Sequence, residues 1–216
     1  MPEGEISRQE FDSIVERFES MREYVKDLKA AFEDHPKTKE KRLNEDLVWS
    51  CTQNATEEEF KSFLHLCTEY DLDPVKKEIW FIKPKPDSKP MIQTSRDGYL
   101  KIANRHEQFD GMSSDAVYEG DTLLKRHDES LEIVYGPSHL AFDKTKLMGA
   151  FCCVFRKDRA KAVAVFVSFK DYNKGTHIWI QYPNAMIIKV AESMAIKRAF
   201  SISGLVSQEE MNTKEE

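Results

Sequence analysis

Two long apolar runs constrain the fold of this 216-residue chain more than any other feature. Residues 147–155 and 162–169 are almost wholly apolar, and the six residues of sequence RKDRAK, at positions 156–161, separate them. Apolar runs of this length on either side of a short polar segment are typical of two strands joined in a hairpin. Because neither run alternates polar with apolar residues, both faces of the hairpin must be covered. We therefore predict that the hairpin is central in a sheet and that its turn is strongly basic.

A long helix is predicted after this hairpin, from Pro183, a residue favoured in the first helical turn, to about Phe200. At 100° per residue its apolar side chains form one stripe, made of Ile187, Val190, Ala191, Met194 and Ala195. Lys189 and Lys197 lie on the opposite side, but Arg198 falls within the stripe. An unpaired buried guanidinium is very costly. We therefore expect a buried Arg198 to meet a carboxylate, backbone carbonyls or a bound anion, or to interact with the helix dipole.

Shorter elements are predicted upstream. Thr56 and Glu59 form a capping box that opens a helix. Residues 78–82 and 91–94 are predicted to be two strands around a proline-rich turn, and a short helix follows from about Arg96 to Asn104. Together with the hairpin and the long helix, these elements predict an α+β fold.

The N-terminal region has its own pattern. A capping box at residues 7–10 opens a helix whose apolar residues recur at alternating spacings of three and four. This heptad seam consists of Phe11, Ile14, Phe18, Met21, Val25, Leu28 and Phe32. A narrow seam suits docking on another subunit, and packing on the chain's own core is the alternative. We divide the chain into an N-terminal helical region (1–55), a core (56–205) and an acidic tail (206–216).

Charge is distributed unevenly along the chain. Residues 144–198 hold eleven Lys or Arg against three acids, whereas the whole chain has a net charge of −6. Clustered cations on an acidic protein point to a polyanionic partner, because counterion release makes Lys and Arg the main source of nucleic-acid affinity. The alternative is that these cations only solvate strand and helix faces.

Several classes of protein are disfavoured by the sequence. It contains no apolar run long enough for a transmembrane helix, and its N-terminus has no signal-peptide pattern. Cys51, Cys67, Cys152 and Cys153 form no CxxC pair, so we expect neither a metal site nor a disulfide framework, and we expect a reducing cytoplasm. No G-x-x-x-x-G-K-[ST] loop is present, which argues against an ATP-driven enzyme.

Several short motifs occur in an order that resembles one family. They are PVKKEIW at 74–80, DGY at 97–99, QFDGM at 108–112, FRKDR at 155–159, the set Trp179, Pro183 and Met186, KVAE at 189–192, AIKRAF at 195–200, and Gly204 with EEM at 209–211. From about Glu58 to Met211 the chain resembles the RecT/Redβ (Bet) family of phage single-strand annealing proteins. The resemblance implies a Rad52-like annealing core, in which a small antiparallel sheet carries a long helix packed across it, with the N-terminal helices added.

The resemblance also implies a function. Members of the family coat single-stranded DNA and anneal it to a complementary strand without ATP, as rings or helical filaments and without a catalytic site. It implies no cofactor and no metal. It implies further partners in a phage exonuclease and the host single-strand binding protein, and a location in the cytoplasm of a bacterial host.

Ten cations are carried over by position as DNA-binding residues, and the last seven are also selected by the charge pattern. They are Lys77, Arg96, Lys101, Arg156, Lys157, Arg159, Lys161, Lys189, Lys197 and Arg198. Gly98 is expected to allow a close approach of two backbones. Four aromatic residues are candidates for stacking on bases, with core packing as the alternative. They are Trp80, Tyr99, Trp179 and Tyr182.

Two rival functions remain open. A Mg²⁺-dependent nuclease acting on DNA would need a pair of carboxylates, and Glu78 with Asp97 is the best candidate pair. A scaffold that binds no nucleic acid would use the heptad seam alone.

Overall fold

A computed structural model describes residues 43–207 and four isolated helical positions, Arg8, Glu19, Arg22 and Lys26. The chain divides into two compact units, Met1–Arg42 and Leu43–Glu216, and the fold below is that of the second. The predicted heptad seam lies outside the described residues and stays a prediction. It consists of Phe11, Ile14, Phe18, Met21, Val25, Leu28 and Phe32.

The central sheet has the strand order β3–β6–β7 and is antiparallel throughout. Its strands are β3 (Phe109–Tyr118), β6 (Leu147–Arg156) and β7 (Val163–Ser168). The predicted hairpin is therefore confirmed as β6 and β7. Only β6 is central, because β7 forms an edge of the sheet, and the exposed Phe166 on β7 shows that this strand is not covered on both faces.

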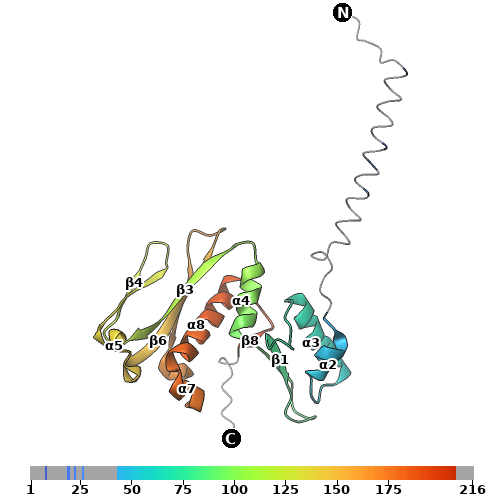
Figure 1. Cartoon of the computed structure of the whole chain (residues 1–216), viewed down its shortest axis with the longest axis horizontal. Coiled ribbons are helices and arrows are strands. Elements are labelled where there is room, and N and C mark those ends of the chain that lie inside the picture. Colours follow the sequence, from blue (N-terminus) through green and yellow to red (C-terminus); the bar gives the residue numbers. More distant parts are fainter. Residues whose placement is uncertain (1–7, 9–18, 20–21, 23–25, 27–42, 208–216) are drawn as a thin grey trace, which may run out of the picture. The chain divides into compact units, whose positions relative to one another are not determined.

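Two different elements cover the two faces of β6. Ala150, Cys152 and Val154 face α8 (Pro183–Ala199), which lies across the sheet (Figure 1). Phe151 packs on the other face, against the hairpin of β4 (Thr122–Lys125) and β5 (Leu131–Val134), which a second apolar cluster joins to the sheet. Covering on both sides is the physical reason for the unbroken apolar run in β6.

A smaller lobe combines the first elements of this unit with its last strand. Its helices and strands are α2 (Glu45–Ser50), α3 (Glu57–Glu69), β1 (Ile79–Ile82), β2 (Met91–Thr94) and β8 (Val206–Ser207). The capping box of α3 is confirmed, since Thr56 Oγ1 accepts from the amide of Glu59 and the Glu59 carboxylate accepts from the amide of Thr56. β1 and β2 pair as the predicted hairpin, and β8 pairs with β2 in parallel.

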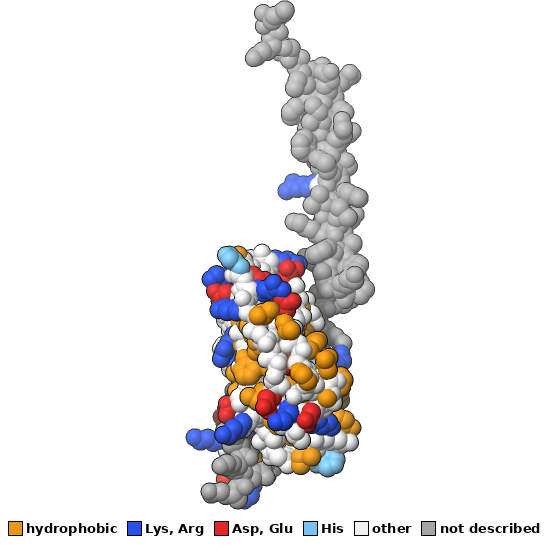
Figure 2. All heavy atoms as spheres, turned by 90° about the vertical axis from the view of Figure 1, so that its left-hand side faces the viewer, with side chains coloured by type: hydrophobic (Ala, Val, Ile, Leu, Met, Phe, Trp, Pro, Cys, Tyr) orange, Lys and Arg blue, Asp and Glu red, His pale blue; other side chains and the backbone are white. Residues whose placement is uncertain are grey.

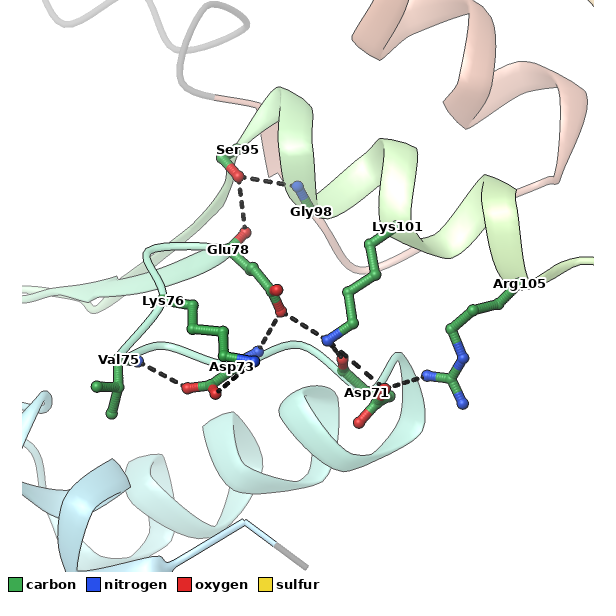
Figure 3. A network of polar contacts seen from close by, with 9 residues as sticks. All are labelled: Asp71, Asp73, Val75, Lys76, Glu78, Ser95, Gly98, Lys101 and Arg105. Carbon is green, nitrogen blue, oxygen red and sulfur yellow. Dashed lines mark hydrogen bonds and ion pairs between the residues drawn. The ribbon is translucent and has the colours of Figure 1, made fainter. Parts of the chain in front are cut away.

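A polar network joins this lobe to α4 (Arg96–Arg105), as Figure 3 shows. Glu78 Oε2 accepts from Lys101 Nζ at 2.8 Å and from the amide of Asp73 at 2.8 Å. Lys101 Nζ also donates to the carbonyl oxygen of Asp71. Gly98 lies against the carbonyl oxygen of Glu78, where an added Cβ would stand 2.4 Å away, so the expected close backbone approach is confirmed.

The remaining short elements surround the central sheet. They are α5 (Pro137–Leu140), the 3₁₀ helix η1 (Lys144–Lys146), α6 (Phe169–Tyr172) and α7 (His177–Gln181). The predicted α+β fold, with a small antiparallel sheet and a long helix across it, is confirmed. Within the described part of the chain, no helix combines the length and the apolar character needed to cross a bilayer.

Candidate nucleic-acid interface

The last turn of α8 carries two cations beside a cavity, the exposed Arg198 and the partly buried Lys197. Lys197 and Arg198, with Met194 and Ile202, line a cavity of about 340 Å³. Arg198 is exposed, so the prediction that it is buried is wrong. A cationic rim around the apolar side chains of Met194 and Ile202 can hold a phosphate and also cover part of a sugar or base.

The position of Arg198 follows from the way α8 is covered. The predicted stripe assumed a single buried face, but the sheet covers one side of α8 and α4 covers another. Four residues of the predicted stripe, Ile187, Val190, Ala191 and Ala195, are buried, and Met194 is half-buried. The C-terminal half of the helix also buries Glu192, Ser193, Ile196 and Ala199. The stripe that contained Arg198 thus reaches solvent before the helix ends.

Glu192 is the buried charge on α8. Its side chain is only 6% exposed, and its two oxygens accept from Arg96 Nε at 2.5 Å and from Ser114 Oγ at 2.7 Å. The hydrogen bond to Glu192, followed by that to Asp97, raises the pKa of the Arg96 guanidinium above its ordinary value. Arg96 thus joins the start of α4 to α8. Because it pairs with two carboxylates, its positive charge is neutralised and would attract DNA phosphates only weakly.

Arg156 has a similar internal role. Its Nη1 donates to the carbonyl oxygen of Ala199 at 2.6 Å, and its guanidinium lies over the ring of Phe200. Nε and Nη2 donate to the two carboxylate oxygens of Asp158 at 2.8 and 2.7 Å, and the hydrogen bonds to Asp158 raise the pKa of Arg156. Arg156 therefore pins the β6–β7 hairpin to the C-terminal end of α8.

The contacts of Arg156 bring the hairpin turn and the last turn of α8 to the same end of the molecule. Lys157 and Arg159 are exposed in the turn, and Lys161 pairs with Glu129 on the surface. We call the following set the basic end. It consists of Lys157, Arg159, Lys161, Lys197 and Arg198.

Three of the predicted cations lie elsewhere. Lys101 is held in the polar network by Glu78 and the carbonyl oxygen of Asp71. Lys77 is exposed in the turn before β1 with a left-handed φ of 62°. Lys189 is exposed on α8, but nine residues separate it from Arg198, which corresponds to half a turn around and roughly 13 Å along the helix.

The four aromatic candidates for stacking on bases differ in their exposure. Tyr99 and Trp179 are buried in the core, so neither offers a ring face to a base. Tyr182 is exposed and Trp80 is half-buried. Ile202 is a cavity residue that sequence reasoning missed, because it follows the end of α8 and no periodic pattern includes it.

The carboxylates proposed for a nuclease are already engaged. Glu78 accepts from Lys101 and from a backbone amide, and Asp97 accepts from Arg96 at 3.0 Å. Among the residues that the structure describes, no group of three or more His, Cys, Asp or Glu side chains is arranged to hold a metal ion. This geometry favours the binding of a polyanion over metal-assisted cleavage.

An α+β core with cations gathered at one end suits a polyanionic partner. The model of the RecT family matches residues 36–216, so the chain belongs to the RecT family. Membership makes it a DNA recombination protein of the strand-annealing class. None of the curated proteins matches the chain.

Proposed function

We propose that this protein binds single-stranded DNA at its basic end and anneals it to a complementary strand without ATP, as a homo-oligomer. The observation that carries the proposal is that three cations are exposed and form no ion pair with any described residue. Within residues 43–207, no carboxylate pairs with Lys157, Arg159 or Arg198, whereas Arg96, Lys101 and Arg156 are each held by acids. Unpaired exposed cations release counterions when phosphates bind, and this release drives affinity for DNA.

Annealing places a further demand on the site, because base edges must stay available to the second strand. Phosphate contacts from Lys and Arg position a strand without engaging its base edges. The cavity beside α8 fits this requirement, since Lys197 and Arg198 supply charge while Met194 and Ile202 supply only apolar surface. Little dependence on base sequence follows from such contacts.

Other parts of the proposal come from the family resemblance. The protein has no catalytic step and needs no cofactor, and it acts in the bacterial cytoplasm. Its further partners are a phage exonuclease and a host single-strand binding protein. The N-terminal seam is a contact between subunits. A nuclease would need Mg²⁺ and would shorten a labelled oligonucleotide. Intact product after incubation with Mg²⁺ is the outcome expected here.

The salt dependence of binding tests the basic end directly. Each phosphate contact removed should lower the slope of log affinity against log salt by about 0.7 for single-stranded DNA. We therefore expect Lys157→Ala, Arg159→Ala and Arg198→Ala to lower the slope by about 2 when combined. The matched control is Lys85→Ala, an exposed lysine in the β1–β2 turn.

Fluorescence anisotropy over a series of salt concentrations measures the slope, and quenching between labelled complementary strands measures annealing. The triple variant should also anneal more slowly, and no step should require ATP. A triple variant with the slope of the unaltered chain would place the DNA site elsewhere on the molecule.

A further inference from the structure

The loop between β4 and β5 lies beside the basic end. It consists of residues 126–130, of sequence RHDES. The amide of Ala162, which follows Lys161 of the basic end, donates to the carbonyl oxygen of Asp128 at 2.8 Å. Apolar side chains of both hairpin strands pack in one cluster with Phe151 and Ala162, which holds the loop in this place. Figure 1 shows this loop and the loop between β6 and β7 at the same, upper end of the unit.

Glu129 is the residue of this loop that contacts a cation of the basic end. Its carboxylate accepts a hydrogen bond from Lys161 Nζ, and its second oxygen lies 3.9 Å from Lys125 Nζ. The hydrogen bond from Lys161, followed by the charges of Lys161 and Lys125, lowers the pKa of Glu129, so the carboxyl is ionised at neutral pH. The side chains of Lys161 and Glu129 are 66% and 40% exposed, so solvent and ions reach the pair. Lys161 is therefore partly neutralised, whereas Lys157 and Arg159 have no carboxylate partner among residues 43–207.

The backbone of Glu129 is a second, independent observation. Its φ of 63° is left-handed, as is the φ of 50° at the exposed Phe142 after α5. The loop requires this conformation, because the Glu129 amide donates to the carbonyl oxygen of Arg126 at 3.0 Å and the Arg126 amide donates to that of Ser130 at 2.9 Å. Glycine or asparagine ordinarily occupies such a position. What the carboxylate contacts, and not the loop itself, explains a glutamate here.

Arg126, the arginine of this loop, is also paired within the hairpin. It forms an ion pair with Glu132, and Asp128 accepts from the amide and the hydroxyl of Ser130. Residues 122–134 hold two Lys or Arg against three Asp or Glu, so the hairpin brings a negative charge to the basic end. Figure 2 looks onto the face that carries this hairpin, and Lys or Arg side chains stand beside Asp or Glu side chains at its upper end.

We propose that the Glu129 carboxylate is an internal counter-ion, which occupies Lys161 and withholds one phosphate contact from the basic end. A phosphate reaches Lys161 only by displacing the carboxylate, so the exchange of one anion for another changes the free energy of binding little. Each phosphate contact steepens the salt dependence of binding, so the pair helps to set the salt concentration at which the chain releases DNA. This role rests on the proposed function, since it concerns the same basic end.

Removal of the carboxylate charge tests this role. Glu129→Gln keeps the shape of the side chain but frees Lys161, so the slope of log affinity against log salt should rise by about 0.7 for single-stranded DNA. Binding at low salt should be roughly two- to fivefold tighter than that of the unaltered chain. This advantage should shrink by about 2.6-fold as the salt rises from about 50 to about 200 mM. Fluorescence anisotropy of a labelled oligothymidylate measures the affinity and the slope.

Two companion variants separate the pair from a general effect of charge. Lys161→Ala combined with Glu129→Gln removes both partners and should keep the slope of the unaltered chain, because Lys161 makes no phosphate contact there. Glu119→Gln is the matched control. Its carboxylate holds Lys146 at 2.8 Å in an exposed pair next to the end of β3 that lies away from the basic end, and its loss should leave the slope unchanged.

Three results would overturn this role. One is an unchanged slope for Glu129→Gln, and another is a slope lowered by about 0.7 for the double variant, since Lys161 would then already bind a phosphate in the unaltered chain. The third is an equal rise for Glu119→Gln, which would reduce the effect to net charge. If circular dichroism shows that Glu129→Gln disturbs the fold, Glu129→Gly carries the test, because glycine suits the left-handed φ and also lacks the carboxylate. An unaltered chain that binds no single-stranded DNA would overturn the proposed function, and this role with it.

Discussion

Glu192 should matter more to stability than any cation at the end of α8. Glu192→Ala removes two hydrogen bonds to an ionised, buried acceptor, from Arg96 and Ser114. Hydrogen bonds to charged groups contribute about 1.5–3 kcal/mol each, and breaking a buried pair costs about 3–5 kcal/mol. Arg96 is 30% exposed and keeps Asp97 as a partner, which reduces the loss. We therefore expect the free energy of unfolding to fall by about 3 kcal/mol.

The assay compares this variant with two others. Thermal unfolding followed by circular dichroism should show a Tm lowered by roughly 6–12 °C for Glu192→Ala in a chain of this size. Glu192→Gln keeps the volume and one acceptor and should lose less. Arg198→Ala should stay within about 0.5 kcal/mol of the unaltered chain, since its side chain is exposed. Equal losses for Glu192→Ala and Arg198→Ala would refute the assignment of the buried charge to Glu192.

Two further changes probe other contacts. Gly98→Ala should lower the free energy of unfolding by about 1–3 kcal/mol, because the new Cβ would meet the Glu78 carbonyl oxygen at 2.4 Å. Urea denaturation measures this loss. An unchanged urea midpoint would show that α4 can shift freely to make room for the methyl group. Burial raises the pKa of Asp121, but hydrogen bonds from the Gly136 amide and from His139 hold it below its ordinary value of 3.8. A depressed carboxyl pKa stabilises the fold above the ordinary value, and that stability is lost as the pH falls through the folded pKa. Asp121→Asn should thus be the less stable form at pH 7, with a deficit that narrows below about pH 4 in acid titrations, and a constant deficit would contradict this.

Local patterns predicted most of the elements. The capping box at Thr56 and Glu59, the β1–β2 hairpin, the β6–β7 hairpin and the helix from Pro183 all depend on residues close in sequence. The local preferences of these residues predict the final structure because the tertiary contacts favour the same helices and strands. The partner strand β3 was not predicted, since its run has the left-handed Gly111 near a register shift and no regular alternation.

The candidate site was harder to predict, because its geometry depends on distant residues. Arg96 and Glu192 are 96 residues apart, and a helical projection of α8 contains no information about α4. The projection therefore assigned the buried charge to Arg198 instead of Glu192. Likewise, no local pattern distinguishes Arg156, which is held by Asp158, from the exposed Arg159 three residues later.

The left-handed backbone at Phe142 has a consequence for engineering this chain. A bulky residue held in that conformation lowers the stability of the fold by about 1–2 kcal/mol relative to glycine or asparagine at the same position. Selection for heat resistance would therefore favour Phe142→Gly, and the purified subunit would gain stability. Because most of the ring faces solvent, the change would cost little core packing. Position 142 is therefore a site where thermal stability can be raised without altering the core.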